Sequence, residues 1–423
     1  MKDETKGMNR RAFLRHSASL MAMGAAGLAV PVVRAEPSDQ SQDPMREPGA
    51  LPRPYGERSP FETAQRWGAG GPGSAHGWGA NAPNNINSTA PLQDLHGIVT
   101  PSALHFERHH NGVPAIDPAR HRLLIHGLVD RPMVFTLNDL ERVPSVSRLV
   151  FLECSGNSWD CWSEKAADFT VQELHGLTST SEWTGVKLST LLELVGVQRG
   201  ASWMLAEGSD AAGLDRSVPL TREVLDEAMI CYGQNGEALR PEQGYPMRLL
   251  LPGYEGNINV KWLRRLKLGT APFMTRWETA KYTDLMPDGK AYQFSLVMEA
   301  KSVITSPSGR QQIQPGFHEI RGLAWSGRGR VTKAEVSVDG GRTWQQARLQ
   351  EPVLPKCHTR FRLPWRWDGQ EAILQSRCTD ETGYVQPTRQ DLVKVRGTNS
   401  VYHYNGIQSW KVERDGHVRN VSV

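Results

Sequence analysis

The spacing of hydrophobic and polar residues divides the chain into two regions with different predicted structures. From about Thr100 to Tyr282, short apolar runs alternate with amphipathic stretches. Residues 121–129 and 147–155 are typical of strands, whereas 188–196 and 220–233 have helical periodicity, the second with Thr221 as its expected N-cap. This mixture predicts an α+β domain.

The region after about Phe294 has a different pattern, in which short alternating runs are separated by turn residues. In VTKAEVSVDGGRTW (331–344), Ala334, Val336 and Val338 share one face, and a turn follows at Asp339-Gly340-Gly341. This is the pattern of a β-hairpin, and the region has about the size of an immunoglobulin-like sandwich. The predicted fold is therefore an α+β domain followed by an all-β sandwich.

The first 35 residues are typical of an export signal. Paired Arg10 and Arg11 precede an apolar stretch at 18–33, with an expected cleavage site after Ala35. The paired arginines indicate a twin-arginine signal, which exports folded proteins; an ordinary secretory signal is the alternative. The apolar stretch is interrupted by glycines and is shorter than the roughly 20 residues that cross a bilayer. We therefore expect a periplasmic protein without a membrane span.

Length, charge and cysteine content narrow the class of protein further. A chain of 423 residues favours two folded units. The net charge is +4, and Lys and Arg are spread along the chain, which argues against nucleic-acid binding. An odd count of five cysteines leaves at least one thiol without an intrachain partner, although Cys357 and Cys378 could pair. No Cys-x-x-Cys-His motif occurs, so no c-type haem is expected on this chain.

Cys154 is a candidate functional residue because it follows a predicted strand and precedes the turn residues Ser155-Gly156-Asn157. This position predicts a thiol at a strand end, facing a cleft. Three interpretations are open: a catalytic nucleophile, a structural core thiol, or a single thiolate ligand to a metal centre whose cofactor supplies the other ligands. A redox pair with Cys161 is less favoured, since six residues separate the two cysteines.

Two basic stretches predict an anion-binding site. Arg108, His109 and His110 are crowded together. Adjacent histidines in a strand point to opposite faces, which argues against a bidentate metal pair. Arg248 and Lys261 flank a Gly-Tyr-Glu-Gly-Asn loop between two strand-like segments. Backbone N–H groups with nearby Arg and Lys can bind phosphate, while an exposed basic loop is the alternative.

Five motifs, in order, resemble the sulfite oxidase family of molybdenum enzymes over about residues 90–400. They are Phe-x-Arg-x-His at 106–110, Cys-x-Gly-Asn at 154–157, Glu-Trp-Thr-Gly-Val-Lys-Leu at 182–188, Gly-Tyr-Pro-x-Arg at 244–248 and Val-Lys-Trp-Leu at 260–263. The stretch GLAWSGRGRVTKAEVSVDGGRTW resembles that family's dimerisation domain. Within the family, HGWGANAPNNINSTAPLQDLHGIVTPSALHFERHH and NSVYHYNGIQSW resemble the periplasmic sulfane dehydrogenases of thiosulfate-oxidising bacteria.

The resemblance implies a cofactor, molybdenum-molybdopterin, and a role for each matching residue. Cys154 matches the thiolate that ligates molybdenum, and Arg108 and Tyr282 match substrate-pocket residues with catalytic roles. The implied cofactor-binding residues are Phe106, Glu107, Arg108, His109, His110, Asp210, Gln243, Arg248, Asn259, Val260 and Lys261. The implied reaction transfers an oxygen atom derived from water to sulfur, and the electrons pass to a separate c-type cytochrome.

The resemblance also implies a domain organisation and partners. It comprises a signal peptide (1–35), an extended arm rich in Pro, Gly and Asn (36–90), a molybdopterin-binding catalytic domain (91–288), an immunoglobulin-like dimerisation domain (289–410) and a C-terminal tail (411–423). The implied assembly is a homodimer through the second domain, and a heterotetramer with the cytochrome. A sulfur-carrier protein is the implied substrate.

Three departures from the family pattern bear on the substrate. Ser158 and Trp159 stand where sulfite oxidases usually have arginines, and Gln243 stands where they have histidine. A dianion such as sulfite gains most from paired arginines, so the departures favour sulfane sulfur on a carrier over free sulfite. Alternatives are a free-sulfite dehydrogenase, a hydrolase with Cys154 as nucleophile, and a non-catalytic interaction protein.

Overall fold

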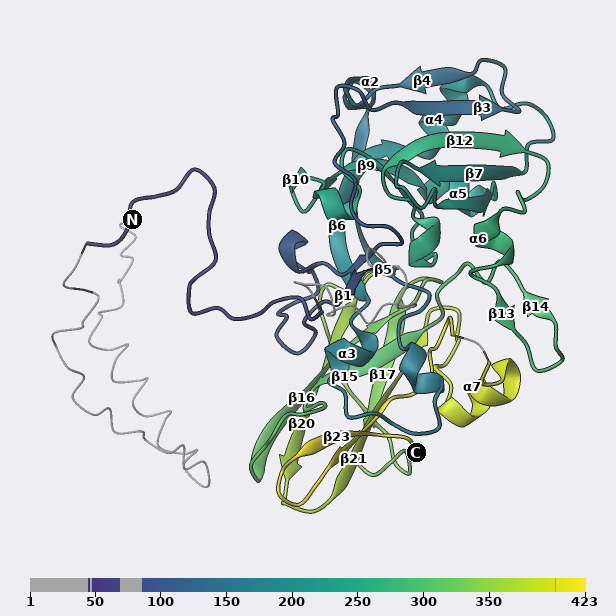
Figure 1. Cartoon of the computed structure of the whole chain (residues 1–423). Helices are drawn as coiled ribbons and strands as arrows, with labels where there is room; N and C mark the ends of the chain where they lie inside the picture. The colour runs from purple at the N-terminus through teal and green to yellow at the C-terminus, as the bar shows by residue number, and fades with distance from the viewer. Residues whose placement is uncertain (1–44, 46–47, 69–85, 400) are drawn as a thin grey trace, which may run out of the picture. The chain divides into compact units, whose positions relative to one another are not determined.

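The computed structural model describes residues 45, 48–68, 86–399 and 401–423 (Figure 1). The predicted signal peptide and most of residues 69–90 in the predicted arm lie outside the described residues. The described residues fall into two units that divide after Glu62. Up to Glu62 they contain no α-helix and no strand, and the larger unit, Thr63–Val423, contains every sheet described below.

The N-terminal half of the larger unit contains two five-stranded sheets among the described residues (Figure 1). One has the order β10-β9-β6-β5, with β11 also paired to β9, and consists of β5 (Ser145–Glu153), β6 (Thr178–Lys187), β9 (Met229–Gln234), β10 (Glu237–Ala238) and β11 (Arg248–Leu250). The other has the order β4-β3-β12-β7-β8 and consists of β3 (Leu123–Gly127), β4 (Met133–Phe135), β7 (Trp203–Gly208), β8 (Asp215–Pro219) and β12 (Leu263–Gly269). The β3–β12 pair is parallel, and the other pairs are antiparallel.

Short helices connect these strands. They are α2 (Leu137–Glu141), α3 (Val171–His175), α4 (Leu188–Val195), α5 (Arg222–Glu227) and α6 (Arg276–Thr279). The predicted strands at 121–129 and 147–155 and the helix at 188–196 are confirmed, and the Thr221 side chain caps α5 by accepting from Val224 N–H at 3.3 Å. The helix predicted over 220–233 is wrong in its second half, because Met229–Gln234 is a strand that pairs with both β6 and β11.

The C-terminal half is a β-sandwich of two antiparallel sheets in the described residues. The sheet ordered β15-β16-β20-β19 contains β15 (Lys301–Ser306), β16 (Gly316–Trp325), β19 (Arg348–Gln350) and β20 (Thr359–Trp367). The sheet ordered β18-β17-β21-β22-β23 contains β17 (Val331–Ser337), β18 (Gln345–Gln346), β21 (Ala372–Asp380), β22 (Ser409–Val412) and β23 (Val418–Val421). The predicted hairpin at 331–344 is confirmed by the β17–β18 pairing.

Two elements outside the sandwich sheets complete this half. A small hairpin pairs β13 (Asp284–Leu285) with β14 (Ala291–Tyr292), and helix α7 (Arg389–Arg396) precedes β22. The prediction of a separate C-terminal tail at 411–423 is wrong. These residues supply the end of β22 and all of β23, because Trp410 and its neighbours pair with β21 on one side and β23 on the other.

One of the buried hydrophobic clusters among the described residues joins the two halves. Phe151 and Trp183 from the first half belong to the same buried cluster as Trp325 and Trp410 from the second. Because of this continuity, residues 63–423 form one compact unit, although their sheets are separate. Within the described part of the chain, no helix has the length and hydrophobicity needed to cross a membrane.

Candidate active site

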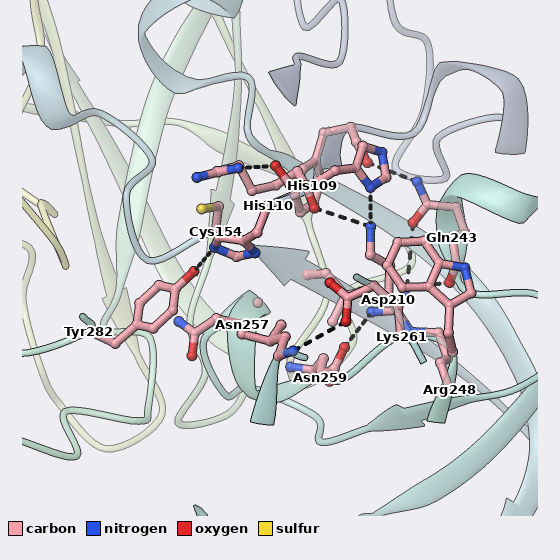
Figure 2. A pocket seen from close by; sticks show the side chains of 16 residues that line it. His109, His110, Cys154, Asp210, Gln243, Arg248, Asn257, Asn259, Lys261 and Tyr282 are labelled. Atoms are coloured by element: carbon pink, nitrogen blue, oxygen red, sulfur yellow. Dashed lines mark hydrogen bonds between the residues drawn. The ribbon is translucent and has the colours of Figure 1, made fainter. Parts of the chain in front are cut away.

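Cys154 lies directly after β5, at the edge of a cleft in the larger unit (Figure 2). Its N–H donates to Leu177 O at 2.9 Å, and its carbonyl accepts from Asn157 N–H at 2.9 Å, so the turn after the strand is fixed on both sides. Gly256 lies against the same turn, where a Cβ would be only 2.8 Å from Glu153 O. The sequence-based placement of Cys154 at a strand end facing a cleft is confirmed.

The cleft contains about 650 Å³ of space, part of it open to solvent. It brings together most of the predicted site residues, namely Phe106, Arg108, His109, His110, Cys154, Asp210, Gln243, Arg248, Asn259, Lys261 and Tyr282. Two predicted residues do not line it. Glu107 instead pairs with Arg66 and His109, and Val260 is packed in a hydrophobic cluster behind the cleft.

Two extended segments distant in sequence hold Arg108 in place. β1 (Asn87–Ser88) pairs antiparallel with β2 (Glu107–Arg108), and in this pairing Arg108 lies opposite Asn87. His109 continues the pairing, exchanging hydrogen bonds with Ile86 at 2.8 and 3.1 Å. The end of the predicted arm therefore forms part of the support of the site.

One end of the cleft contains Cys154, Tyr282 and His110 (Figure 2). Burial raises the pKa of the Cys154 thiol, and the positive charge of Arg108 opposes this shift. The Tyr282 hydroxyl and His110 Nε2 are hydrogen-bonded at 2.6 Å. Burial, followed by the charge of Arg108, lowers the pKa of His110 to about 2, so this imidazole is neutral near pH 7. Arg108 is therefore the lining cation that acts on the Cys154 end.

The other end of the cleft is built around Lys261. Its Nζ lies 3.1 Å from Arg108 O, 3.0 Å from Glu242 O and 2.9 Å from His109 Nδ1, which together match the three N–H bonds of an ammonium. His109 Nδ1 must then be an acceptor, so its Nε2 carries the proton donated to Glu107 at 2.7 Å. Burial, and then the charge of Arg248, lowers the pKa of Lys261.

Arg248 is a second buried cation at this end. Its guanidinium donates to Gln243 O at 2.9 Å and to Asn259 O at 3.0 Å, and it stacks over the Trp183 ring at 4.8 Å. Its Nε is buried without a hydrogen-bond partner in the described part of the chain, and burial lowers the pKa of Arg248 to about 10. Since Arg248 and Lys261 are hydrogen-bonded to carbonyls rather than to carboxylates, an anionic group in the cleft would restore the balance of charge.

The donor set fits a metal bound through a cofactor rather than by the protein alone. Among the described residues, no group of three or more His, Cys, Asp or Glu side chains could hold a metal ion. Cys154 can therefore supply one soft ligand, and an anionic cofactor lying along Lys261 and Arg248 would have to supply the others.

Several residues at the site escaped the sequence analysis. Arg216 is fully buried and donates to Glu278 at 3.0 Å and Glu255 at 3.3 Å, while its guanidinium lies 4.9 Å from the centre of the Tyr282 ring. Asn257 lines the cleft and donates to Glu255 at 2.6 Å. Asn257 belongs to the loop already predicted to bind phosphate, so that signal was present, whereas the Arg216 contacts join residues far apart in sequence.

The C-terminal segment also reaches the site. The Tyr402 hydroxyl accepts from Tyr282 N–H at 3.4 Å, and His403 Nε2 lies 3.3 Å from Glu255. His403 N–H donates to Ser155 O at 2.7 Å, next to Cys154. The sequence offered only the resemblance of this segment, and in the structure the segment lies behind the lining of the cleft, where it contacts Tyr282, Glu255 and Ser155.

Because of Glu255, the stability of the protein should vary with pH in the acidic range. Burial opposes ionisation of Glu255, but Arg216 and His403 outweigh it and lower the pKa to about 2, below the value near 4.3 expected in the unfolded chain. A depressed carboxyl pKa stabilises the folded state above the unfolded pKa, and this stability is lost as the pH falls toward 2. Urea unfolding at pH 6 and pH 3 should show the loss, and Glu255→Gln should reduce its size; equal losses in the two proteins would contradict this assignment.

Comparison with known proteins assigns the class of this fold and site. Residues 110–277 match the oxidoreductase molybdopterin binding domain, and residues 293–409 match the Mo-co oxidoreductase dimerisation domain. Sulfite oxidase from Gallus gallus is 31% identical over 369 residues, which cover 78% of this chain and 79% of that protein. The chain therefore belongs to the sulfite oxidase family of molybdopterin oxidoreductases, and the predicted family, fold class and molybdenum-molybdopterin cofactor are confirmed.

The chain is also similar to a solved structure and to further relatives. The crystal structure of the sulfane dehydrogenase SoxCD from Paracoccus pantotrophus superposes with a TM-score of 0.81 at 43% identity, covering 90% of this chain and 99% of that chain. Mitochondrial sulfite oxidase from Mus musculus is 30% identical over 332 residues, covering 73% of this chain and 61% of that protein. NADH nitrate reductase from Solanum lycopersicum is 31% identical over 351 residues, covering 72% of this chain and 38% of that protein. The chain thus spans 61% and 38% of the length of these two relatives, less than two thirds in each case.

Proposed function

We propose that this protein is the catalytic subunit of a periplasmic sulfane dehydrogenase. In this proposal it oxidises sulfane sulfur held on a carrier protein, within thiosulfate oxidation, and passes the electrons to a c-type cytochrome subunit. The observation that carries the proposal is the likeness to the sulfane dehydrogenase SoxCD, at 43% identity over 90% of the chain. The paired Arg10 and Arg11 support the periplasmic location.

The residues of the cleft have distinct roles in this proposal. Molybdenum-molybdopterin, when bound, supplies oxygen-atom transfer to sulfur and accepts two electrons. Cys154 would hold the metal, and the cations Lys261 and Arg248 would hold the anionic cofactor. Arg108 and Tyr282 would orient the substrate beside Cys154, since all three residues line the same cleft.

The charges at the Cys154 end support a sulfane substrate over free sulfite. Arg108 is the cation there, the buried His110 is neutral, and the charge of Arg216 is matched by Glu255 and Glu278. Of the three departures that predicted a missing charge, Gln243 lines the cleft, whereas Ser158 and Trp159 do not. A dianion would meet one cation rather than a pair, whereas a neutral or singly charged sulfane would lose less.

The proposed assembly is a homodimer formed through the second domain, which joins the cytochrome in a heterotetramer. The match of residues 293–409 to the Mo-co oxidoreductase dimerisation domain supports the homodimer. The molar mass of the protein purified alone would test the homodimer. The molar mass of the protein purified with its cytochrome would test the heterotetramer.

The test of the proposed function compares two substrates in the purified protein. Molybdenum and pterin are first quantified, and a protein without either would point to a cysteine hydrolase or an interaction protein instead. Reduction of a c-type cytochrome is then followed with free sulfite or with a peptide that carries a cysteine persulfide. We expect the higher kcat/KM with the persulfide. Efficient oxidation of free sulfite without any carrier would favour the alternative, a free-sulfite dehydrogenase.

A further inference from the structure

β5 presents its side chains to two parts of the molecule, because successive side chains in a strand point to opposite faces. Leu152 lines the cleft, as does Cys154 directly after the strand. Phe151 and Glu153 face the second domain: the Phe151 ring lies 6.4 Å from that of Trp325, and the Glu153 carboxylate accepts from the Trp325 indole N–H at 2.7 Å. The residue that precedes Cys154 is therefore anchored outside the cleft.

The Glu153 carboxylate is buried and receives three donors. Lys301 Nζ donates to Oε1 at 3.0 Å, Asn157 Nδ2 donates to the same oxygen at 2.9 Å, and the Trp325 indole donates to Oε2. The Glu153 and Lys301 side chains are each 1% exposed. Lys301 begins β15 and Trp325 ends β16, so two of the donors come from the second domain.

Lys301 also fixes the far side of the Cys154 turn through Ser158. Lys301 Nζ donates to Ser158 Oγ at 2.7 Å, and Ser158 Oγ lies 2.6 Å from His175 Nδ1. Since an ammonium can only donate, the Ser158 hydroxyl donates to His175, which leaves the ring proton on Nε2, 3.2 Å from Gln408 Oε1. Burial, and then Lys301, lowers the pKa of His175, in agreement with this neutral imidazole.

A buried ion pair adds little to the stability of a fold, because desolvation of both charges offsets much of their attraction. The Lys301 pair is more readily explained by geometry. Its ammonium connects the residue before Cys154 with Ser158, four residues after it, and so fixes both ends of the turn that carries the thiol. Groups that orient a metal ligand through hydrogen bonds commonly control how that ligand meets the metal.

We propose that Lys301, a residue of the second domain, is a positioning residue for Cys154 and sets the direction from which the thiolate meets the metal. The inference rests on the proposed function insofar as Cys154 is the ligand. It assigns the second domain a role in the active site in addition to dimerisation. Loss of the Lys301 ammonium should loosen the turn and change the orientation of Cys154, although no side chain that lines the cleft is itself substituted.

The test uses Lys301→Met in the molybdenum-loaded protein. We expect kcat to fall about 10- to 100-fold, the size of effect typical of residues that orient a metal ligand, with little change in KM. The Mo(V) electron paramagnetic resonance spectrum should shift as well, because its g-values respond to the orientation of the cysteine sulfur. Lys333→Met is the matched control, since Lys333 pairs with Glu335 at 3.0 Å on the partly exposed face of the same domain.

A milder variant keeps the test decisive if Lys301→Met does not fold. Trp325→Phe removes one donor to Glu153 but leaves Lys301 and Asn157 in place, so a folded protein with a smaller shift of the same kind is expected. The proposal is overturned if a folded Lys301→Met protein, or failing that Trp325→Phe, has the wild-type spectrum and kcat.

A metal-free measurement separates this inference from the proposed function. In protein prepared without cofactor, the alkylation rate of Cys154 by iodoacetamide is followed by peptide mass spectrometry. We expect faster alkylation in Lys301→Met than in wild type or Lys333→Met, because the turn is no longer tied to the second domain. Equal rates would contradict the inference, whereas a wild-type protein that never contains molybdenum would contradict only the proposed function.

Discussion

Serine in place of Cys154 is expected to reduce turnover below detection while the protein stays folded. A thiolate is a soft ligand that suits molybdenum, and a serine hydroxyl remains protonated and hard. The Cys154 side chain lies at the wall of a cleft, and the substitution changes one atom, so the free energy of unfolding should change by no more than about 1 kcal/mol. Steady-state assays measure the turnover, elemental analysis measures whether molybdenum is still bound, and unfolding experiments measure the stability.

Cys161→Ser is the matched control for this substitution. Cys161 is seven positions further along the chain, does not line the cleft, and has its sulfur 3.6 Å from Gln408 Oε1. All five cysteines are free thiols, including Cys357 and Cys378, which the sequence allowed to pair. We expect Cys161→Ser to keep its molybdenum and its activity. Normal turnover in a folded Cys154→Ser protein would refute the assignment of Cys154 as the metal ligand.

Methionine in place of Arg216 is expected to destabilise the protein by about 3–5 kcal/mol, the range seen when one partner of a buried ion pair is removed. Arg216 is fully buried and donates to Glu255 and Glu278, which are themselves 2% and 1% exposed. Methionine keeps the apolar stem but leaves both carboxylates without their cation. Urea unfolding at pH 7 measures the loss.

The same substitution should also act on the site, because Arg216 supports the Tyr282 ring at 4.9 Å. Arg222→Met is the control for stability: the Arg222 side chain is 95% exposed and lies 3.6 Å from Asp226, so its removal should change the free energy of unfolding by less than about 0.5 kcal/mol. If Arg216→Met and Arg222→Met unfold at the same urea concentration, the buried cluster does not stabilise the fold.

The sequence predicts best where the cause is local. The strand before Cys154, the Thr221 cap and the turn at Asp339-Gly340-Gly341 each depend on neighbouring residues, and each is confirmed. Most residues that line the cleft were also predicted, because they occur in short motifs or close to them. Glu107 and Val260 were assigned with their motifs, but the direction of each side chain depends on its contacts in the folded chain, where Glu107 pairs with His109 and Val260 is packed in a hydrophobic cluster.

The second half of the predicted helix at 220–233 shows where local reasoning fails. Thr221 and the acidic first turn do start a helix, but Met229–Gln234 becomes a strand. This segment lies between β6 and β11, and its backbone N–H and C=O groups pair with those of both strands. Pairing with strands that lie more than ten residues away in the sequence overrides the helical pattern. A short window of sequence does not contain these partner strands.

By itself the sequence determined the class of protein, since ordered motifs place Cys154 at a strand end and gather basic residues for an anionic cofactor. Only the tertiary structure decided what holds that cysteine and its cleft. Lys301 reaches Glu153 across 148 residues, and Arg216 reaches Glu278 across 62. The physical reason is that a buried charge needs a partner in space rather than in sequence, and only the folded chain brings the two together.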